Sequence, residues 1–323
     1  MIHILFTGGT ISMRHSAAAG GAVPALGAAD LAALAPGLDQ IGLVELEDWG
    51  RFPAAHLDLT RLWNLRNRVA AIAAEEKAAG IVVTHGTDTI EETAYLLART
   101  VAPDVPVVVT GAMRTSEEAG WDGGRNIVDS ARVAAEPASR GRGAMVVLNG
   151  TILSGLDAVK TDAGEVDTFQ APRGRPLGSV TGSFVRYTAG GRSASPLPRS
   201  PTGLTARVAL VQAVPGDTGV LLDSALPAYD GLVLVGFGRG NVPPAMAAAA
   251  GRWLAARKPV VLATRCAEGE VLPLYGFEGG GAQLIAAGAL PAGRRAPSQA
   301  WMELLVSLSA GLPFGAGMET AGA

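Results

Sequence analysis

Residues 2–10 of the chain read IHILFTGGT, so the mostly apolar run Ile2–Phe6 leads directly into Thr-Gly-Gly-Thr. A second segment repeats this pattern: the apolar run Gly80–Val83 leads into Thr84–Thr89, which reads THGTDT. Each segment places hydroxyl groups just past the end of an expected buried strand. Ligands of open α/β sheets bind at the carboxyl ends of the strands. We therefore expect two loops, far apart in sequence, to form one pocket that is rich in threonine and poor in positive charge.

The surrounding sequence alternates short apolar runs with helical periodicity. The runs are rich in β-branched residues and lack polar alternation, which is typical of strands covered on both faces. The expected strands are Ile2–Thr7, Ile41–Glu47, Gly80–Thr84, Val105–Thr110 and Ala144–Leu148, and the expected helices are Thr60–Ala79 and Asp88–Arg99. Alternation of this kind predicts a mainly parallel sheet flanked by helices.

The pattern becomes irregular after Lys160, and residues 189–205 read AGGRSASPLPRSPTGLT, a composition typical of linkers. A second alternating set follows. Its expected strands are Arg207–Gln212, Gly231–Val235 and Pro259–Ala263, and its expected helices are Pro243–Ala256, Gly281–Ala287 and Gln299–Ser309. The sequence thus predicts a two-domain α/β protein: a larger N-terminal catalytic domain over residues 1–188, a linker over 189–206 and a smaller C-terminal α/β domain over 207–323.

Composition excludes several classes of protein. Net charge is −3, which argues against nucleic acid as a partner, because binding it normally requires a basic stripe. No apolar run reaches the length of about 18 residues that a membrane span needs. The chain begins in its first strand without a basic leader, so we expect a cytoplasmic protein. With Cys266 as the single cysteine and four histidines without paired spacing, we expect no cysteine or histidine metal site.

The threonine loops suggest hydrolytic chemistry. The hydroxyl of Thr10 is a poor nucleophile at neutral pH and needs a base or a charged partner. Gly8 and Gly9 allow a sharp turn and offer N–H groups to a developing oxyanion. Thr87 and Asp88, at a strand end and helix start, can hold a substrate ammonium group and a water molecule.

Lys160 supplies the third element. A lysine near a threonine acts as its base when burial favours the neutral amine. Thr87, Asp88 and Lys160 would then form a nucleophile, orienting group and base.

Structural roles are the alternative for each of these residues. Thr10 and Thr87 could cap helices, and Asp88 could simply favour a helix N-terminus. Lys160 could be a solvated surface side chain. We interpret His85 as a hydrogen-bonded packing residue rather than a catalyst.

The motifs Phe6–Ile11 (FTGGTI) and Val83–Ala94 (VTHGTDTIEETA) resemble the two signatures of the bacterial-type L-asparaginases, the asparaginase/glutaminase family. Further similarities follow in family order over nearly the whole chain. They are Gly111–Arg114, Asp122-Gly123, Asn126, Lys160 with Asp167–Phe169, and Gly238–Asn241.

The resemblance implies a two-domain amidohydrolase without a cofactor, usually a homotetramer built from tight dimers. Its expected reaction is hydrolysis of the side-chain amide of L-asparagine to L-aspartate and ammonia. Thr10 would attack the amide carbon, the region of Thr87 and Gly9 would bind the oxyanion, and Asp88 would bind the substrate ammonium. Lys160 and Thr87 would move protons.

The resemblance also implies a contribution from a neighbouring subunit's C-terminal domain, for which Asn241 is the best-matched residue. The expected substrate-binding residues are Gly9, Thr87, Asp88, Ala112 and Asn241. The acidic residue contributed across the interface stays open among Glu270, Tyr275 and Glu278 in the tract 268–278.

Two positions depart from the family pattern. Ala22 stands where the lid after the first motif usually carries a tyrosine, and Ala54 or Ala55 stands where a serine usually grips the substrate α-carboxylate. Losing a hydrogen bond to a charged group costs roughly 1.5–3 kcal/mol, or at least about tenfold in binding. Three side chains near these positions could compensate, namely Arg14, His15 and His56. We expect the glycine-rich segment 17–22 to be a flexible closing loop.

These departures leave alternatives open. The substrate could be an asparagine derivative or another amide, or the chain could be a non-catalytic amino-acid-binding protein. The glycine run Gly236–Gly240 would suit a dinucleotide-binding oxidoreductase, but it is a lone match late in the chain and we rank it low.

Overall fold

The computed structural model describes residues 1–75, 78–101, 105–188 and 196–318. The chain divides into two compact units, residues 1–196 and 197–323. This division confirms the predicted two-domain α/β class. The exact linker bounds stay a prediction, because residues 189–195 lie outside the described residues. Within the described residues, no helix is long and apolar enough to cross a membrane.

Unit 1 is built on an eight-stranded sheet in the order β12-β11-β8-β7-β6-β5-β1-β4. Five neighbouring strands pair in parallel and form the centre and one edge of the sheet. They are β1 (Ile2–Gly8), β4 (Val44–Phe52), β5 (Gly80–Thr84), β6 (Val107–Thr110) and β7 (Ala144–Leu148). Antiparallel strands β8 (Thr151–Ser154), β11 (Gly178–Thr181) and β12 (Phe184–Tyr187) extend the other edge.

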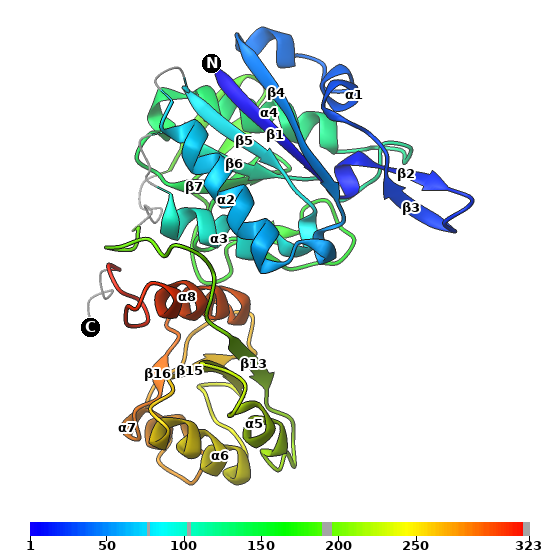
Figure 1. Cartoon of the computed structure of the whole chain (residues 1–323). Helices are drawn as coiled ribbons and strands as arrows, with labels where there is room; N and C mark the ends of the chain where they lie inside the picture. Colours follow the sequence, from blue (N-terminus) through cyan, green and yellow to red (C-terminus); the bar gives the residue numbers. More distant parts are fainter. Residues whose placement is uncertain (76–77, 102–104, 189–195, 319–323) are drawn as a thin grey trace. The chain divides into compact units, whose positions relative to one another are not determined.

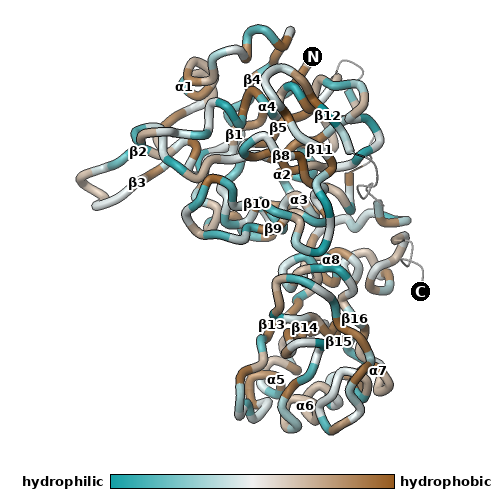
Figure 2. The backbone as a smooth tube through the Cα atoms, turned by 180° about the vertical axis from the view of Figure 1, so that it is seen from behind, coloured by the Kyte–Doolittle hydropathy of each residue, from teal (hydrophilic) through white to brown (hydrophobic). Residues whose placement is uncertain are grey.

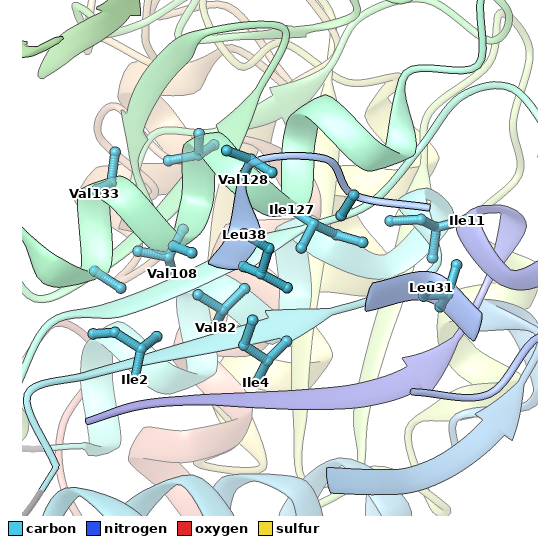
Figure 3. Packing of buried hydrophobic residues seen from close by; sticks show 14 of the residues in the cluster. Ile2, Ile4, Ile11, Leu31, Leu38, Val82, Val108, Ile127, Val128 and Val133 are labelled. Carbon is cyan, nitrogen blue, oxygen red and sulfur yellow. The ribbon is translucent and has the colours of Figure 1, made fainter. Parts of the chain in front are cut away.

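Helices cover both faces of this sheet (Figure 1). On one face lie α1 (Ala28–Ala33) and α4 (Gly123–Ala135), and on the other lie α2 (Leu59–Ala73) and α3 (Ile90–Thr100). Ile4, Val82 and Val108 share one register across β1, β5 and β6 and pack beneath Ile127 of α4 (Figure 3). This two-sided burial explains why the central strands read as continuous apolar runs.

The order of the parallel strands creates a switch point. The chain goes from β1 to β4 on one side, then returns past β1 to β5 on the other side. Loops leaving the carboxyl ends of β1 and β5 therefore diverge, and the crevice between such loops is where ligands bind in open α/β sheets. Thr10 follows β1 and Thr87 follows β5, as the sequence predicted.

The expected strand Ile41–Glu47 was wrong at both ends. Residues Leu38–Ile41 form a 3-10 helix, and β4 runs on to Phe52. As the outermost strand, β4 pairs only with β1 among the strands of the sheet, so it tolerates charged residues that break an apolar run.

Unit 1 differs from the predictions in further features, and α1, β8, β11 and β12 are among the elements that were not predicted. The helix expected over Thr60–Ala79 ends at Ala73, because the chain must turn back before β5 begins at Gly80. Helix α4 was not predicted, since it opens with two glycines. Segment 17–22 forms the turn and the start of the second strand of an antiparallel β-hairpin of β2 (Met13–Ser16) and β3 (Gly21–Pro24), which projects from unit 1 in Figure 1. That it is a flexible closing loop stays a prediction.

Unit 2 is a four-stranded parallel sheet in the order β13-β14-β15-β16, and its strands β14 and β15 run as hydrophobic segments through the unit (Figure 2). The strands are β13 (Val208–Gln212), β14 (Gly231–Gly236), β15 (Val260–Thr264) and β16 (Leu290–Pro291). The helices are α5 (Val220–Ala225), α6 (Pro244–Ala255), α7 (Gly281–Ala286) and α8 (Pro297–Ser309). The three strands and three helices predicted here are present; α5 and β16 were missed.

Candidate active site

The first loop turns sharply because two glycines end β1. Gly8 has φ of 107° and Gly9 has φ of 81°, both in the left-handed region that favours glycine. A short 3-10 helix, η1 (Thr10–Ser12), follows, and the Ser12 hydroxyl donates to the Gly9 carbonyl oxygen at 2.9 Å. Thr10 is half-buried, and its side chain does not cap η1, whose N-cap is Gly9. The capping alternative for Thr10 was therefore wrong.

The Gly9 amide is not available in the way we expected. Its N–H donates to the Phe52 carbonyl oxygen at 3.0 Å, fastening the loop to the end of β4. The prediction that this N–H faces an oxyanion was wrong, because the bond to Phe52 already uses it. The contribution of Gly9 is instead steric, through the side chain that it lacks.

The second loop is held from within by His85. This side chain is fully buried, and its Nδ1 lies 2.9 Å from the Gly86 carbonyl oxygen while its Nε2 lies 2.9 Å from the Thr93 hydroxyl. Because a carbonyl oxygen can only accept, Nδ1 carries the proton and the Thr93 hydroxyl donates to Nε2. Burial lowers the pKa of His85 to about 4. His85 is thus a neutral packing residue, as predicted.

The two loops meet at their glycines. A Cβ atom built on Gly9 would lie 2.3 Å from the Gly86 Cα and 2.4 Å from its nitrogen. Behind them, the Thr7 hydroxyl donates to the Thr84 carbonyl oxygen at 2.8 Å. Thr10 and Thr87 each come directly after one of the touching glycines. The structure therefore brings the two predicted loops together at the carboxyl ends of β1 and β5.

Lys160 reaches these loops from a two-residue strand, β9 (Val159–Lys160). Its Nζ donates to Thr87 Oγ1 at 2.9 Å and lies 2.9 Å from Asp88 Oδ1 in an ion pair. The Lys160 side chain is only 17% exposed, whereas that of Asp88 is 71% exposed. The interpretation of Lys160 as a solvated surface residue was therefore wrong. A half-buried amine, a hydroxyl and an outward-facing carboxylate form one connected set.

Two further observations define this set. The Thr87 side chain caps no helix, because the N-cap of its 3-10 turn η4 (Thr87–Thr89) is Gly86 and that of α3 is Thr89. The backbone N–H of Lys160 donates to Glu91 Oε1 at 2.7 Å. Sequence reasoning gave Glu91 no role, although it belongs to the second motif.

The loop after β6 packs against Thr87. Ala112, an expected substrate-binding residue, is fully buried there. A Cβ built on the preceding Gly111 would lie 3.1 Å from the Thr87 methyl carbon. The loop is held by Asp122 and Asn126, whose side chains bond to its backbone. Sequence reasoning quoted both residues without assigning them a function.

Of the two departures from the family pattern, Ala54 lies against the second loop, and Ala22 lies on the β-hairpin. Ala54 is buried, and a Cβ on Gly86 would lie 2.7 Å from its methyl carbon, whereas Ala55 and His56 are exposed. Ala22 on β3 pairs with His15 on β2, and both are exposed. The hairpin is fastened at the His15 N–H, which donates to Glu117 Oε2 at 2.7 Å. Whether Arg14, His15 or His56 compensates for the missing groups stays a prediction.

The remaining predicted residues lie in unit 2. The half-buried Asn241 accepts the Gly281 N–H on its side-chain oxygen at 3.1 Å, at the start of α7, so its NH2 group is the part that could meet a ligand. Of the open candidates, Tyr275 and Glu278 are exposed and Glu270 is half-buried. The glycine run Gly236–Gly240 ends β14 in a turn closed by backbone bonds between Phe237 and Asn241.

Comparison with known proteins agrees with this architecture. The family model "Asparaginase, N-terminal" matches residues 1–190, and "Glutaminase/Asparaginase C-terminal domain" matches residues 207–315. A probable L-asparaginase of Deinococcus radiodurans is 38% identical over 95% of this chain and 92% of its own length. A probable periplasmic L-asparaginase of Haemophilus influenzae is 34% identical over 75% of this chain and 70% of its own length.

A solved structure extends the likeness to three dimensions. The crystal structure of a probable cytoplasmic L-asparaginase from Campylobacter jejuni has a TM-score of 0.83 and 26% identity, covering 95% of this chain and 94% of that one. Sequence motifs, fold and the meeting of the two threonine loops thus agree, and this chain belongs to the asparaginase family.

Proposed function

We propose that this protein hydrolyses the side-chain amide of L-asparagine to L-aspartate and ammonia, with Thr10 as the nucleophile. The observation that carries the proposal is the contact between Lys160 Nζ and Thr87 Oγ1 at 2.9 Å, beside the loop that ends in Thr10. Membership of the family supports the reaction, and the names of its relatives support the substrate.

The chemistry would run in two halves. The Thr10 hydroxyl attacks the amide carbon, and its proton passes by way of the Thr87 hydroxyl to the neutral form of the Lys160 amine. The amide nitrogen then receives this proton and leaves as ammonia. An ester on Thr10 remains. Water, losing a proton to the same pair, then attacks the ester and releases aspartate and the free hydroxyl. Splitting one difficult step into two in this way is the advantage of covalent catalysis.

Substrate binding would rest on the outward-facing carboxylate. Asp88 is the most exposed member of the connected set and can pair with an α-ammonium group without losing its contact to Lys160. Gly9 would let its loop pack against Gly86 beside the substrate, and Ala112 would offer backbone contacts in a buried loop. Asn241 would contribute from the C-terminal domain of a neighbouring copy in a homotetramer, which sedimentation would test.

The test is ammonia release from L-asparagine by the purified protein and by three variants. Thr10→Ala and Thr87→Ala should each lower kcat by about 100-fold or more. Thr89→Ala is the matched control, because Thr89 lies two residues on in the same turn and its buried hydroxyl has no hydrogen-bond partner within the described part of the chain. Full activity in both Thr10→Ala and Thr87→Ala would refute the assignment.

A second substrate class is favoured by one observation. The buried methyl group of Ala54 packs on Gly86, where a hydroxyl would offer a hydrogen bond to a substrate carboxylate. An asparagine derivative without a free α-carboxylate, or another amide, would not need that bond. A panel of amides decides between the two: a clear preference for free asparagine dismisses the derivative. Saturable aspartate binding without any turnover would instead indicate a non-catalytic amino-acid-binding protein.

We also propose a cytoplasmic location. The name of the Campylobacter relative supports it and that of the Haemophilus relative does not. Fractionation of the source cells would test it.

A further inference from the structure

The side chain of Asn126 joins the ends of two neighbouring strands. It is 1% exposed, and its NH2 group donates to the Gly111 carbonyl oxygen at 2.9 Å, directly after β6, and to Asp122 Oδ2 at 3.0 Å. Its oxygen accepts the N–H of Asn149 at 3.0 Å, directly after β7. Each partner can only accept or only donate, so this is the one orientation of the amide that satisfies all three.

Asp122 completes the arrangement from the start of the same helix. Its carboxylate accepts the backbone N–H groups of Met113 and Arg114 at 3.0–3.1 Å. Together, Asp122 and Asn126 fasten the backbone of Gly111, Met113 and Arg114, so the loop from Gly111 to Arg114 is held at both of its ends. We call this group of bonds the α4 clamp.

The clamp bears on Thr87 through Gly111. A Cβ built on Gly111 would lie 2.5 Å from the His85 carbonyl oxygen and 3.1 Å from the Thr87 methyl carbon. The backbone of Gly111 therefore lies directly against the methyl group of Thr87, whose hydroxyl points the other way, to Lys160. A β-branched side chain has few staggered positions, so the space that its methyl group can occupy also fixes the direction of its hydroxyl.

We propose that Asn126, with Asp122, is a positioning residue that fixes the direction of the Thr87 hydroxyl by holding Gly111 against the Thr87 methyl group. The functional part of this inference rests on the proposed hydrolase activity. Neither residue touches Lys160 in the described contacts, and their effect passes through the backbone of the loop after β6. Without the clamp, Gly111 can move away, Thr87 can rotate, and the bond between its hydroxyl and Lys160 Nζ is lost.

The experiment compares three variants with the wild type. Asn126→Leu removes every bond of the amide at similar volume. The exchange variant Asp122→Asn/Asn126→Asp keeps net charge and volume and retains acceptors for Met113, Arg114 and Asn149. It loses the donor to the Gly111 carbonyl oxygen and the second acceptor of the Met113 N–H, Asp122 Oδ2. Ser130→Ala is the control, because Ser130 lies one turn further along α4, is fully buried, and its hydroxyl has no hydrogen-bond partner among the described residues.

For Asn126→Leu and the exchange variant, we expect kcat/KM for asparagine to fall about tenfold to 100-fold, mostly in kcat, as a small misplacement near the chemistry produces. The pH profile of kcat/KM should also change, since the Lys160 amine loses a partner. Ser130→Ala should change neither. A variant that lost only stability would keep the profile and the kcat of its folded fraction.

Crystal structures of the variants separate this inference from the proposed function. They should show the Thr87 hydroxyl turned away from Lys160 even if the wild type releases no ammonia, in which case the proposed function alone fails. Should Asn126→Leu not fold, the exchange variant decides the matter. An exchange variant with the wild-type direction of the Thr87 hydroxyl and the wild-type pH profile would overturn the proposal.

Discussion

The Cα atom of Gly86 lies where a side chain of Gly9 would begin, 2.3 Å from a Cβ atom built there. The two residues belong to loops that leave neighbouring strands β1 and β5. Backbone lies against backbone at this point, so neither loop can move aside by changing a side-chain rotamer. The contact holds Thr10 near Thr87.

Replacing Gly9 by alanine should therefore disable the site. The new methyl group would overlap Gly86, and φ of 81° with ψ of −177° adds roughly 1–3 kcal/mol of strain for a residue with a Cβ. We expect ammonia release to fall by about 100-fold or more, because the loops must separate by a distance that matters to catalysis. Kinetics and thermal unfolding, measured together, would show both effects.

Gly216→Ala is the matched control for this change. Gly216, in unit 2, also has a positive φ, 77°, but apart from its chain neighbours no heavy atom of the described residues lies within 4 Å of a Cβ built on it. It carries the strain of a positive φ without the overlap, so its activity should stay near that of the wild type. Equal activity losses in the two variants would mean that backbone strain, and not the contact with Gly86, is responsible.

A second prediction concerns the side-chain amine of Lys160. Lys160→Met keeps the aliphatic part of the side chain and removes the partner of Thr87 and Asp88. Proton transfer by a positioned group contributes about 100-fold to 10,000-fold, so kcat should fall within that range. Stopped assays of ammonia release at saturating asparagine would measure it.

Lys258→Met serves as the comparison. Lys258 lies in unit 2, where its ammonium donates to the carbonyl oxygens of Leu226 and Tyr229. Its removal should lower the stability of that unit and leave kcat unchanged. A Lys160→Met enzyme within about threefold of the wild type would exclude Lys160 from the proton transfers.

The sequence allowed the central strands to be predicted because each is buried on both faces. Gly80–Thr84 and Ala144–Leu148 were predicted with their observed bounds, since packing on both sides demands an unbroken apolar run. The bounds of β4 were predicted wrongly because β4 is the outermost strand and carries the charged residues Glu45, Glu47 and Asp48. Helix α4 was not predicted because Gly123 and Gly124 lower the helix propensity of its first turn, although tertiary packing stabilises the helix.

In the candidate site, too, some features could be predicted from the sequence and others could not. The meeting of the two loops was predictable, because a general rule places ligand sites at the carboxyl ends of parallel strands. The bond of the Lys160 amine to Thr87, 73 residues away, has no local signal, and it was expected from the chemistry of the residue types and from the family resemblance. Asp122 and Asn126 were given no role because most of their partners are backbone groups, which look the same in every sequence.

The third prediction concerns His85 in acid. Burial lowers its pKa to about 4 from an unfolded value near 6.5, so between these values the unfolded chain binds a proton that the folded chain does not. The contribution of the neutral side chain is complete above pH 6.5 and is lost as the pH falls towards 4. It amounts to roughly 3 kcal/mol, since one pKa unit corresponds to about 1.4 kcal/mol.

His85→Gln should remove this dependence. The unfolding free energy of the wild type, relative to that of the variant, should decrease from pH 6.5 to pH 4 in urea titrations. His56→Gln, which changes an exposed histidine, should leave the wild-type slope unchanged. A difference between wild type and His85→Gln that is constant across this range would contradict the buried neutral state.

The last prediction concerns Glu92, whose effect on the unfolding free energy changes with pH in the opposite direction to that of His85. Glu92 on α3 has an oxygen, Oε2, that is buried without a hydrogen-bond partner in the described part of the chain, and burial raises its pKa to about 7. Between pH 4.5 and 7 the folded chain holds a proton that the unfolded chain has released. Folding is therefore penalised progressively as the pH rises, by roughly 3 kcal/mol once the pH exceeds 7.

Glu92→Gln keeps the shape of the protonated acid and cannot ionise. Its unfolding free energy should match that of the wild type near pH 4.5 and exceed it increasingly up to pH 8, by an amount of order 3 kcal/mol. The exposed Glu165→Gln should produce no such divergence. Because the His85 and Glu92 effects oppose each other between pH 4.5 and 6.5, the wild type alone would show a nearly flat profile there, and only the two variants separate them. A Glu92→Gln protein no more stable than the wild type at pH 8 would mean that Glu92 is solvated or paired when it ionises.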